Sequence, residues 1–284
     1  MSEKTSGFHG LRVLSLESRR AREIAVLISN NGGVPVVAPS TREVPSSPNP
    51  DGLKFASSLV ENQFGIVIFM TGVGTRALAQ AVESVCSREQ FVEALSRTKV
   101  VARGPKPIAV LRELGVSIAL SVPEPNTWRE ILQGLDNNRD KLPLKDQRVA
   151  VQEHGEPSPE LYAGLKERGA EVFPIRVYEW ALPEDTTPLR NAITALIKNE
   201  IDVSLFTSSI QLRHLLQIAG EMQLREEVIQ ALNGSMVASI GPVTSKTLRE
   251  YGIKVSMEPT HPKMGLLVKE AADKSAELPR QKQS

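Results

Sequence analysis

The chain contains one internal repeat, and this repeat constrains its fold more than any other feature of its 284 residues. Starts of apolar runs, glycines, a threonine and prolines recur at a nearly constant separation. Six such pairs lie 136 or 137 residues apart: Arg12 and Arg148, Gly33 and Gly169, Thr71 and Thr207, Gly104 and Gly241, Gly115 and Gly252, and Pro125 and Pro262. We therefore expect two copies of one structural unit, with a single one-residue insertion between them.

Each copy alternates short apolar runs, rich in β-branched residues, with longer stretches of helical spacing. The strands expected in copy one lie near Leu11–Leu16, Val34–Ala38, Ile66–Met70, Lys99–Ala102 and Val116–Leu120. Those expected in copy two lie near Arg148–Gln152, Ala170–Ile175, Ile201–Phe206, Ser235–Ile240 and Ile253–Met257. The expected helices are Arg20–Asn30, Gly52–Asn62, Gly74–Val85, Pro105–Leu114, Pro159–Arg168, Pro188–Lys198, Ile210–Ile218, Leu224–Leu232 and Val243–Tyr251. This order predicts an α/β fold whose parallel, doubly wound sheets are covered by helices on both faces.

Two extended segments interrupt the alternation at matching places, after the second strand of each copy. They are Pro39–Pro45 and Arg176–Trp180, and both are rich in proline or β-branched residues. Such composition favours linkers, which can pair with each other as two strands.

The composition limits the classes of partner. The formal net charge is +1, so no long-range field attracts nucleic acid or an anionic membrane. Apolar runs such as Ile66–Met70 are far shorter than the roughly 20 residues that cross a bilayer, and no signal-peptide core follows the N-terminal charges. The single cysteine, Cys86, cannot form an internal disulfide, and we interpret it as a small buried hydrophobic residue. We therefore expect a cytoplasmic protein.

Four loops follow predicted strands at the edge where open parallel sheets bind ligands. They are Thr71–Arg76 and Arg103–Lys106 in copy one, and Thr207–Ser209 and Ile240–Thr244 in copy two. Each places glycine, serine or threonine before a helix, so backbone N–H groups and hydroxyls can hold a carboxylate or phosphate. For any one loop, helix capping and turn geometry are the simpler explanation. The four loops together favour a binding site.

Motifs of other common chemistries are missing. Thr71–Arg76 lacks the lysine of a Walker phosphate loop, and it follows a third strand, unlike a dinucleotide fingerprint. No cluster of histidine, cysteine and aspartate has metal-ligand spacing, so we expect no metal and no cofactor. Among the histidines, we place His261 near a ligand and expect His214 on the surface of a helix.

Three stretches resemble one known family in residues, order and spacing. Val237–Leu248 followed by Pro259–Pro262 resembles the family's Ile-Gly-Pro segment and the Pro-Thr loop after it. Leu205–Ser209 resembles its Phe-Thr-Ser strand end, and Val177-Tyr178 resembles its linker tyrosine. With the duplicated plan, these motifs make the chain similar to the uroporphyrinogen-III synthase family over nearly its whole length.

The resemblance implies two flavodoxin-like domains with parallel sheets, joined by two extended linkers. The domains implied are residues 1–41 plus 180–284 and residues 42–179. The repeat alone would instead divide the chain near Leu144.

The resemblance also implies an activity, that of a lyase of porphyrin and heme biosynthesis that needs no cofactor. The family cyclises the linear tetrapyrrole hydroxymethylbilane, with inversion of its last pyrrole ring and loss of water, to uroporphyrinogen III. Tyr178 would donate a proton to the leaving hydroxyl, or it is a packing residue of the linker. The substrate contacts expected at the loops are Arg19, Thr71, Gly72, Arg103, Lys106, Thr127, Thr207, Ser208, Ser209, Gly241, Thr244 and His261. We expect a monomer whose partner is this small molecule, with transient contact to the preceding pathway enzyme left open.

Some residues depart from the family's pattern. Leu16 and Glu17 stand where a Thr-Arg pair is common, and Arg103 replaces an apolar residue before Gly-Pro. Arg19 or Arg20 substitutes as the carboxylate partner, or that contact is lost. The departures keep a second interpretation open, a non-catalytic regulatory module that binds a tetrapyrrole or small anion on the same scaffold. A two-lobed periplasmic-type binder also fits the repeat but conflicts with the missing signal peptide.

Overall fold

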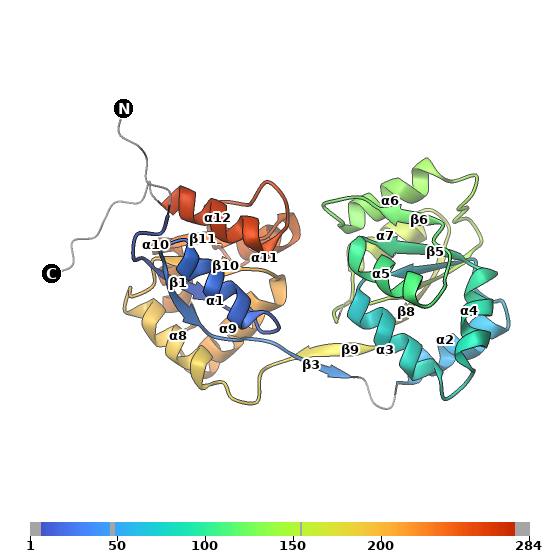
Figure 1. Cartoon of the computed structure of the whole chain (residues 1–284), viewed down its shortest axis with the longest axis horizontal. Helices are drawn as coiled ribbons and strands as arrows, with labels where there is room; N and C mark the ends of the chain where they lie inside the picture. Colours follow the sequence, from blue (N-terminus) through green and yellow to red (C-terminus); the bar gives the residue numbers. More distant parts are fainter. Residues whose placement is uncertain (1–6, 46–48, 154, 276–284) are drawn as a thin grey trace. The chain divides into compact units, whose positions relative to one another are not determined.

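The computed structural model describes residues 7–45, 49–153 and 155–275. Internal contacts divide the chain into two compact units (Figure 1). Unit 1 combines the residues up to Arg42 with those from Ala181 onward, and unit 2 runs from Glu43 to Trp180. Each unit has its own sheet and its own cores.

The sheet of unit 1 has parallel strands in the order β11-β10-β1-β2. They are β1 (Arg12–Ser15), β2 (Val34–Val37), β10 (Val203–Phe206) and β11 (Met236–Ser239). The helices are α1 (Ala21–Asn30), α8 (Thr187–Ile197), α9 (Ser209–Glu221), α10 (Arg225–Gly234), α11 (Pro242–Glu250) and α12 (Met264–Ser275). Because successive side chains of a strand point to opposite faces, Val13 packs with α1 and α12, whereas Leu14 packs with α8 and α9.

The sheet of unit 2 has parallel strands in the order β6-β5-β4-β7-β8. They are β4 (Ile66–Phe69), β5 (Lys99–Arg103), β6 (Leu120–Val122), β7 (Arg148–Gln152) and β8 (Glu171–Ile175). One face is covered by α2 (Pro50–Val60), α3 (Gly72–Val82), α4 (Arg88–Ser96) and α5 (Pro105–Glu113), and the other by α6 (Trp128–Asn137) and α7 (Pro159–Glu167). The predicted α/β fold, with parallel sheets covered on both faces, is confirmed.

The two sheets have the same plan, but each combines strands from both copies of the repeat. β1 and β2 correspond to β7 and β8, while β10 and β11 correspond to β4 and β5. The first strands of one copy therefore pair with the later strands of the other. The helix N-caps after the third strands, Thr71 and Ser208, are 137 residues apart, so the insertion precedes the third strand. The sequence match of Thr71 with Thr207 is one residue out of register.

The chain passes between the units through β3 (Arg42–Pro45) and β9 (Tyr178–Ala181), which form a separate two-stranded sheet (Figure 1). The predicted pairing of the two extended segments is confirmed. Tyr178 begins the return segment.

Other expected elements differ from the structure. The last strand of copy one begins at Leu120, where the sequence pattern placed its end. The strand expected at Ile253–Met257 is reduced to a single bridge between Met257 and Ala238. The helices α4, α6 and α12 were not expected.

One ion pair links α6 to α7 and gives unit 2 a defined pH dependence. Arg168 donates hydrogen bonds of 2.8 and 2.7 Å to the two carboxylate oxygens of Asp136. These hydrogen bonds lower the pKa of Asp136. A group whose pKa is lowered by folding stabilises the folded state above its ordinary pKa, and the stabilisation is lost as the pH falls through the folded-state value.

We expect Asp136→Asn to lower the free energy of unfolding at neutral pH by about 1 kcal/mol, because both side chains are roughly one-third exposed and solvent screens the pair. Urea denaturation across a pH series should show this difference shrinking well below pH 3.8, the ordinary pKa of the group. Asp140→Asn, an exposed acid nearby, serves as the control. A difference that is independent of pH would contradict the ion-pair explanation.

Candidate functional site

In unit 2, the residues after β4 form a polar cluster at the carboxyl edge of the sheet. Thr71 is the N-cap of α3, and its hydroxyl oxygen accepts the N–H of Gly74 at 3.0 Å. Gln152, buried at the end of β7, accepts the N–H groups of Met70 and Thr71, both at 3.2 Å. This buried amide oxygen satisfies two donors of the strand-to-helix turn and fixes the position of Thr71. Gln152 was not among the predicted site residues.

Two glycines allow this turn to pack closely. A Cβ atom on Gly74 would overlap with Nε2 of Gln152. A Cβ atom on Gly72 would lie 2.9 Å from the backbone oxygen of Lys106 in α5. The structure thus brings together two predicted contact residues, Gly72 and Lys106.

Tyr178 lies in the core of unit 2, with its hydroxyl near Thr71. Its exposed fraction is 3%, and its ring packs edge-to-face on Trp180 with the centroids 5.6 Å apart. The hydroxyl oxygens of Tyr178 and Thr71 are 3.4 Å apart. Tyr178 therefore packs in the core of unit 2 while its hydroxyl reaches the carboxyl edge of the sheet.

Arg103, at the end of β5, adds a positive charge to this cluster. Its Nε atom is buried and has no hydrogen-bond partner among the described residues. Burial lowers the pKa of the Arg103 guanidinium, and the charge interaction with Tyr178 opposes this shift. Arg103 is half-buried, and a buried Nε without a partner is costly, so an anion bound at Arg103 would recover part of that cost.

Thr127 has a structural role in unit 2. Its hydroxyl donates to Glu130 at 2.5 Å and accepts the N–H of Arg129 at 3.2 Å. Its backbone N–H donates to Glu130 at 2.7 Å as part of the capping box at the start of α6. Because the hydroxyl hydrogen is used within the cap, Thr127 is not placed to donate to a ligand. This differs from the contact expected from the sequence.

A buried acid follows Gln152 at the end of β7. Glu153 is 4% exposed and accepts a hydrogen bond of 2.5 Å from the Tyr162 hydroxyl, while Nε of Arg176 lies 3.6 Å from its other oxygen. Burial and the hydrogen bond to Glu153 raise the pKa of Tyr162. The hydrogen bond between Tyr162 and Glu153 links α7 to the end of β7.

In unit 1, Glu17 occupies the carboxyl edge next to Thr207. The Thr207 hydroxyl donates to Glu17 at 2.6 Å and accepts from Nε2 of the Gln211 amide at 2.7 Å. Oε1 of Gln211 accepts the N–H of Thr207 at 2.8 Å. The hydroxyl hydrogen of Thr207, expected to grip a substrate carboxylate, is therefore directed to Glu17.

The other predicted contacts of unit 1 lie along the same edge. Ser208 caps α9 without a side-chain hydrogen bond, and Ser209 is the first residue of that helix. Gly241 precedes α11, whose first turn contains the buried Thr244. The loop of the exposed His261 reaches this place, because Pro262 would lie 3.8 Å from a Cβ atom on Gly241. Arg19 is exposed in the turn after β1.

Two other sequence interpretations can be compared with the structure. His214 is 6% exposed, and its Nδ1 lies 2.6 Å from the carbonyl oxygen of Ser40, so the expectation of a surface residue was wrong. A helix position alone did not reveal that α9 packs against the segment leaving β2. Cys86 is buried, as expected, and burial raises the pKa of its thiol.

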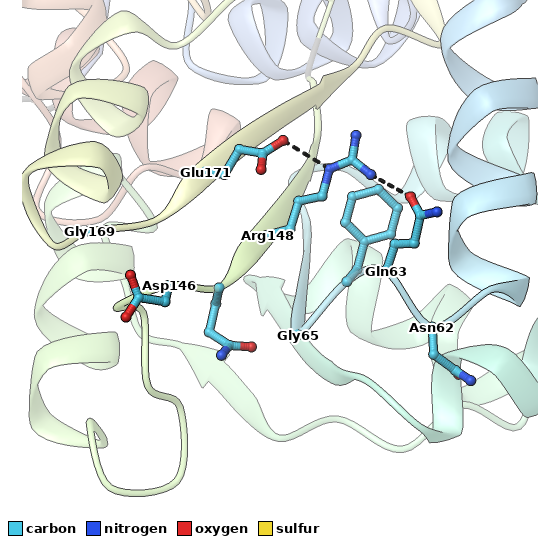
Figure 2. Close-up of a pocket in the computed structure, with 9 residues that line it drawn as sticks. Asn62, Gln63, Gly65, Asp146, Arg148, Gly169 and Glu171 are labelled. Carbon is cyan, nitrogen blue, oxygen red and sulfur yellow. Dashed lines mark hydrogen bonds and ion pairs between the residues drawn. The ribbon is translucent and has the colours of Figure 1, made fainter.

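A hollow of about 800 Å³ lies at the opposite, amino edge of the sheet in unit 2 (Figure 2). Its central side chain is Arg148, which donates to Glu171 at 3.1 Å and to Gln63 at 2.7 Å. The same guanidinium lies over the rings of Phe64 and Phe173, 5.0 Å from each centroid. Because two nitrogens of Arg148 are bound by neighbours and its guanidinium covers two rings, we assign this hollow a structural role and place the candidate site at the carboxyl edge.

Two kinds of feature are not found within the described ranges of the chain. No helix there is both long and apolar enough to cross a membrane. No group of three or more histidine, cysteine, aspartate and glutamate side chains is placed to hold a metal ion.

Comparisons with known proteins agree on one family. The family model described as "Uroporphyrinogen-III synthase HemD" matches residues 22–269. The chain is 33% identical over 270 residues to "Uncharacterized protein YjjA" of Bacillus subtilis, which covers 94% of this chain and 96% of that protein. It is 31% identical over 235 residues to the "Putative uroporphyrinogen-III synthase" of Methanothermobacter thermautotrophicus, with 82% and 87% covered.

Solved structures support the fold. A mutant uroporphyrinogen III synthase from the extremely thermophilic bacterium Thermus thermophilus superimposes with a TM-score of 0.69 at 24% identity, covering 93% of this chain and 98% of that one. The Helicobacter pylori uroporphyrinogen-III synthetase gives a TM-score of 0.55 at 16% identity, covering 92% and 98%.

Proposed function

This chain belongs to the uroporphyrinogen-III synthase family, and from that premise we propose that it cyclises hydroxymethylbilane to uroporphyrinogen III with inversion of the last pyrrole ring. The reaction needs no cofactor. We further propose that the protein acts as a cytoplasmic monomer on this small molecule, which it receives from the preceding pathway enzyme.

The observation that carries the proposal is the cluster of Arg103, Thr71 and Tyr178 at the carboxyl edge of unit 2. The Arg103 Nε is buried without a hydrogen-bond partner among the described residues, and two hydroxyls 3.4 Å apart lie in the same cluster. The substrate carries several carboxylates, and a guanidinium matches their geometry. Gly72 and Lys106, at the starts of α3 and α5, add backbone N–H groups and a second cation.

The chemistry requires a proton at the leaving hydroxyl. In the proposed first step, the C–O bond of the hydroxymethyl group breaks, its electron pair leaves with the oxygen, and the Tyr178 hydroxyl supplies the proton that completes water. Arg103 stabilises the resulting tyrosinate through its charge. After the last bond of the macrocycle has formed, the proton released from the unsubstituted α-carbon of the last pyrrole ring returns to Tyr178, so the enzyme is unchanged.

Ring inversion is a problem of positioning rather than of acid strength. Spontaneous closure joins the ends of the linear tetrapyrrole without inversion. Carboxylates held at fixed points keep the last ring turned so that its substituted carbon is attacked first, which gives a spiro intermediate. The older bond from that carbon to its bridging methylene then breaks, and the methylene bonds to the unsubstituted α-carbon of the same ring, which loses its proton. We assign this holding role in unit 2 to Thr71, Gly72, Arg103 and Lys106. In unit 1 we assign it to Arg19, Ser208, Ser209, Gly241, Thr244 and His261.

One observation favours the second candidate, a non-catalytic module that binds a tetrapyrrole or a small anion. Glu17 places a negative charge at the edge of unit 1, next to Thr207. Such a charge opposes the binding of a substrate with many carboxylates.

The isomer of the product distinguishes the two candidates. We expect the protein, incubated with freshly generated hydroxymethylbilane, to give predominantly isomer III after oxidation and chromatographic separation of the uroporphyrins. A reaction without protein supplies the uncatalysed rate and isomer I. If only isomer I forms, at the uncatalysed rate, the enzyme proposal fails and the binding module takes its place.

A further inference from the structure

The carboxyl edge of unit 1 carries a fixed anion where the other loops offer hydrogen-bond donors. We propose that Glu17 determines specificity by accepting hydrogen bonds from ligand N–H groups, so that unit 1 recognises pyrrole nitrogens of a tetrapyrrole beside the carboxylates assigned to its other loops. This inference rests on the proposed function for the ligand class. It assigns a role to Glu17, which with Leu16 stands where a Thr-Arg pair, two hydrogen-bond donors, is common in the family.

The direction of each hydrogen bond around Thr207 follows from chemistry. The backbone N–H of Thr207 can only donate, so Oε1 of Gln211 accepts it at 2.8 Å. Nε2 of the same amide must then donate to the Thr207 hydroxyl, at 2.7 Å. The hydrogen of that hydroxyl points to Glu17, whose carboxylate accepts it at 2.6 Å. The direction of these three hydrogen bonds is therefore fixed, and Glu17 is the final acceptor, because a carboxylate has no proton to donate.

Glu17 also takes the position that a bound anion would take between two helices. Its Oε1 accepts the N–H of Arg20 at 3.3 Å, just before α1, while its Oε2 is bound by Thr207 near the start of α9. The Arg20 guanidinium is held by Glu23 and does not form an ion pair with Glu17. A ligand carboxylate placed here would therefore meet a negative charge that Arg20 offsets only in part, since its guanidinium is hydrogen-bonded to Glu23.

The chemistry of the ligand identifies what Glu17 can bind. A carboxylate accepts hydrogen bonds, so its partner must be a donor. Apart from the hydroxymethyl group that leaves, a linear tetrapyrrole has carboxylates, which accept, and pyrrole N–H groups, which donate. The pyrrole N–H groups match Glu17, and the carboxylates match Arg103 in unit 2. Glu17 is partly exposed, so a ligand can reach it.

Two related ligands separate recognition of N–H groups from recognition of carboxylates. Uroporphyrinogen III and uroporphyrin III carry the same carboxylates, but the flexible porphyrinogen can turn its N–H groups outward, whereas the flat porphyrin keeps them inside the ring. We would measure binding of both to the whole chain by calorimetry without oxygen. Glu17→Gln is expected to weaken porphyrinogen binding about tenfold and Glu17→Ala about 30-fold, with porphyrin binding changed by less than about twofold.

Glu200→Gln is the matched control. It removes a carboxylate of unit 1 that pairs with Arg12 at 3.0 Å, at the other end of the same strands. We expect its affinity for both ligands to equal that of the wild type.

The outcomes are distinct. Tighter porphyrinogen binding by Glu17→Gln would overturn the inference, because Glu17 would then act only by repulsion. Equal losses for the two ligands, or no binding of either by the wild type, would also overturn it.

The isomer assay tests the reaction independently of this binding experiment. If the protein forms only isomer I, yet its porphyrinogen affinity falls in Glu17→Gln, the proposed function is refuted and the role of Glu17 is supported. If the protein forms isomer III, but Glu17→Gln binds porphyrinogen as tightly as the wild type, the proposed function is supported and the role of Glu17 is refuted.

Discussion

Replacing Tyr178 by phenylalanine is expected to lower kcat about 100-fold, with product affinity changed less than about threefold. The hydroxyl is the proton donor proposed for departure of water, and phenylalanine keeps the ring while removing the proton. The ring remains packed in the core of unit 2 against Trp180. Loss of the contact to Thr71, which is long at 3.4 Å, should lower the free energy of unfolding by less than about 1 kcal/mol.

Two measurements test this expectation together. Initial rates with freshly generated hydroxymethylbilane give kcat, and titration with uroporphyrinogen III gives affinity. Tyr251→Phe removes a hydroxyl from a half-buried ring at the end of α11 and serves as the control, for which we expect wild-type kinetics. Unaltered turnover in Tyr178→Phe would remove Tyr178 from the mechanism and leave it only the packing role.

The layout of the sheets could be predicted because buried parallel strands are continuous apolar runs, and the repeat doubled that signal. The exchange of strands between the copies is not encoded in any local pattern. The pairing of β1 with β10 joins residues about 190 positions apart, such as Val13 with Val203. A repeat indicates that two units exist but does not say which half of each copy enters which sheet.

The unexpected helices divide into two kinds. α4 and α6 each begin with a capping box, at Ser87 with Gln90 and at Thr127 with Glu130. That spacing is visible in the sequence, so both helices could have been found. α12 has no cap of this kind, and its apolar residues are explained only by packing on α1 and the sheet.

The polar partnerships of the candidate site were the least predictable part. Thr71 and Arg103 could be named because each follows a strand. Gln152 and Glu17 could not, because each acts on a residue brought to it by strand packing. Gln211 acts on Thr207, four residues before it, so its contact is local and was missed. Glu17 and Thr207, for example, are 190 positions apart. The sequence analysis expected hydrogen-bond donors for an anionic ligand at that edge, whereas the structure places the carboxylate of Glu17 there.

Replacing Arg103 by methionine is expected to lower kcat/KM about 100-fold, equivalent to roughly 2.7 kcal/mol of transition-state binding. Methionine has a similar length and no charge, so the variant removes the cation without leaving a large cavity. The loss should fall on both KM and kcat, because Arg103 is proposed to hold a substrate carboxylate in the ground state and to stabilise the Tyr178 tyrosinate as water leaves. Steady-state kinetics with hydroxymethylbilane would separate the two constants.

Stability should change in the opposite direction from activity. The Arg103 side chain is half-buried and its Nε has no hydrogen-bond partner among the described residues, so the free protein bears the cost of a partly desolvated cation. We expect the Tm of Arg103→Met to equal or exceed that of the wild type. A residue retained for structure would show the reverse, a lower Tm and activity lost only through unfolding.

The matched control is Arg97→Met, which removes an exposed guanidinium just before β5, where it pairs with Glu93 at 3.1 Å. We expect wild-type kcat/KM for this variant, because Arg97 lies before the amino end of β5, whereas Arg103 lies at the carboxyl end of the same strand. Adding uroporphyrinogen III should raise the Tm of the wild type and of Arg97→Met more than that of Arg103→Met. Equal shifts in all three proteins would mean that Arg103 holds no ligand carboxylate, and the anion site of unit 2 would then have to depend on the backbone N–H groups at the starts of α3 and α5.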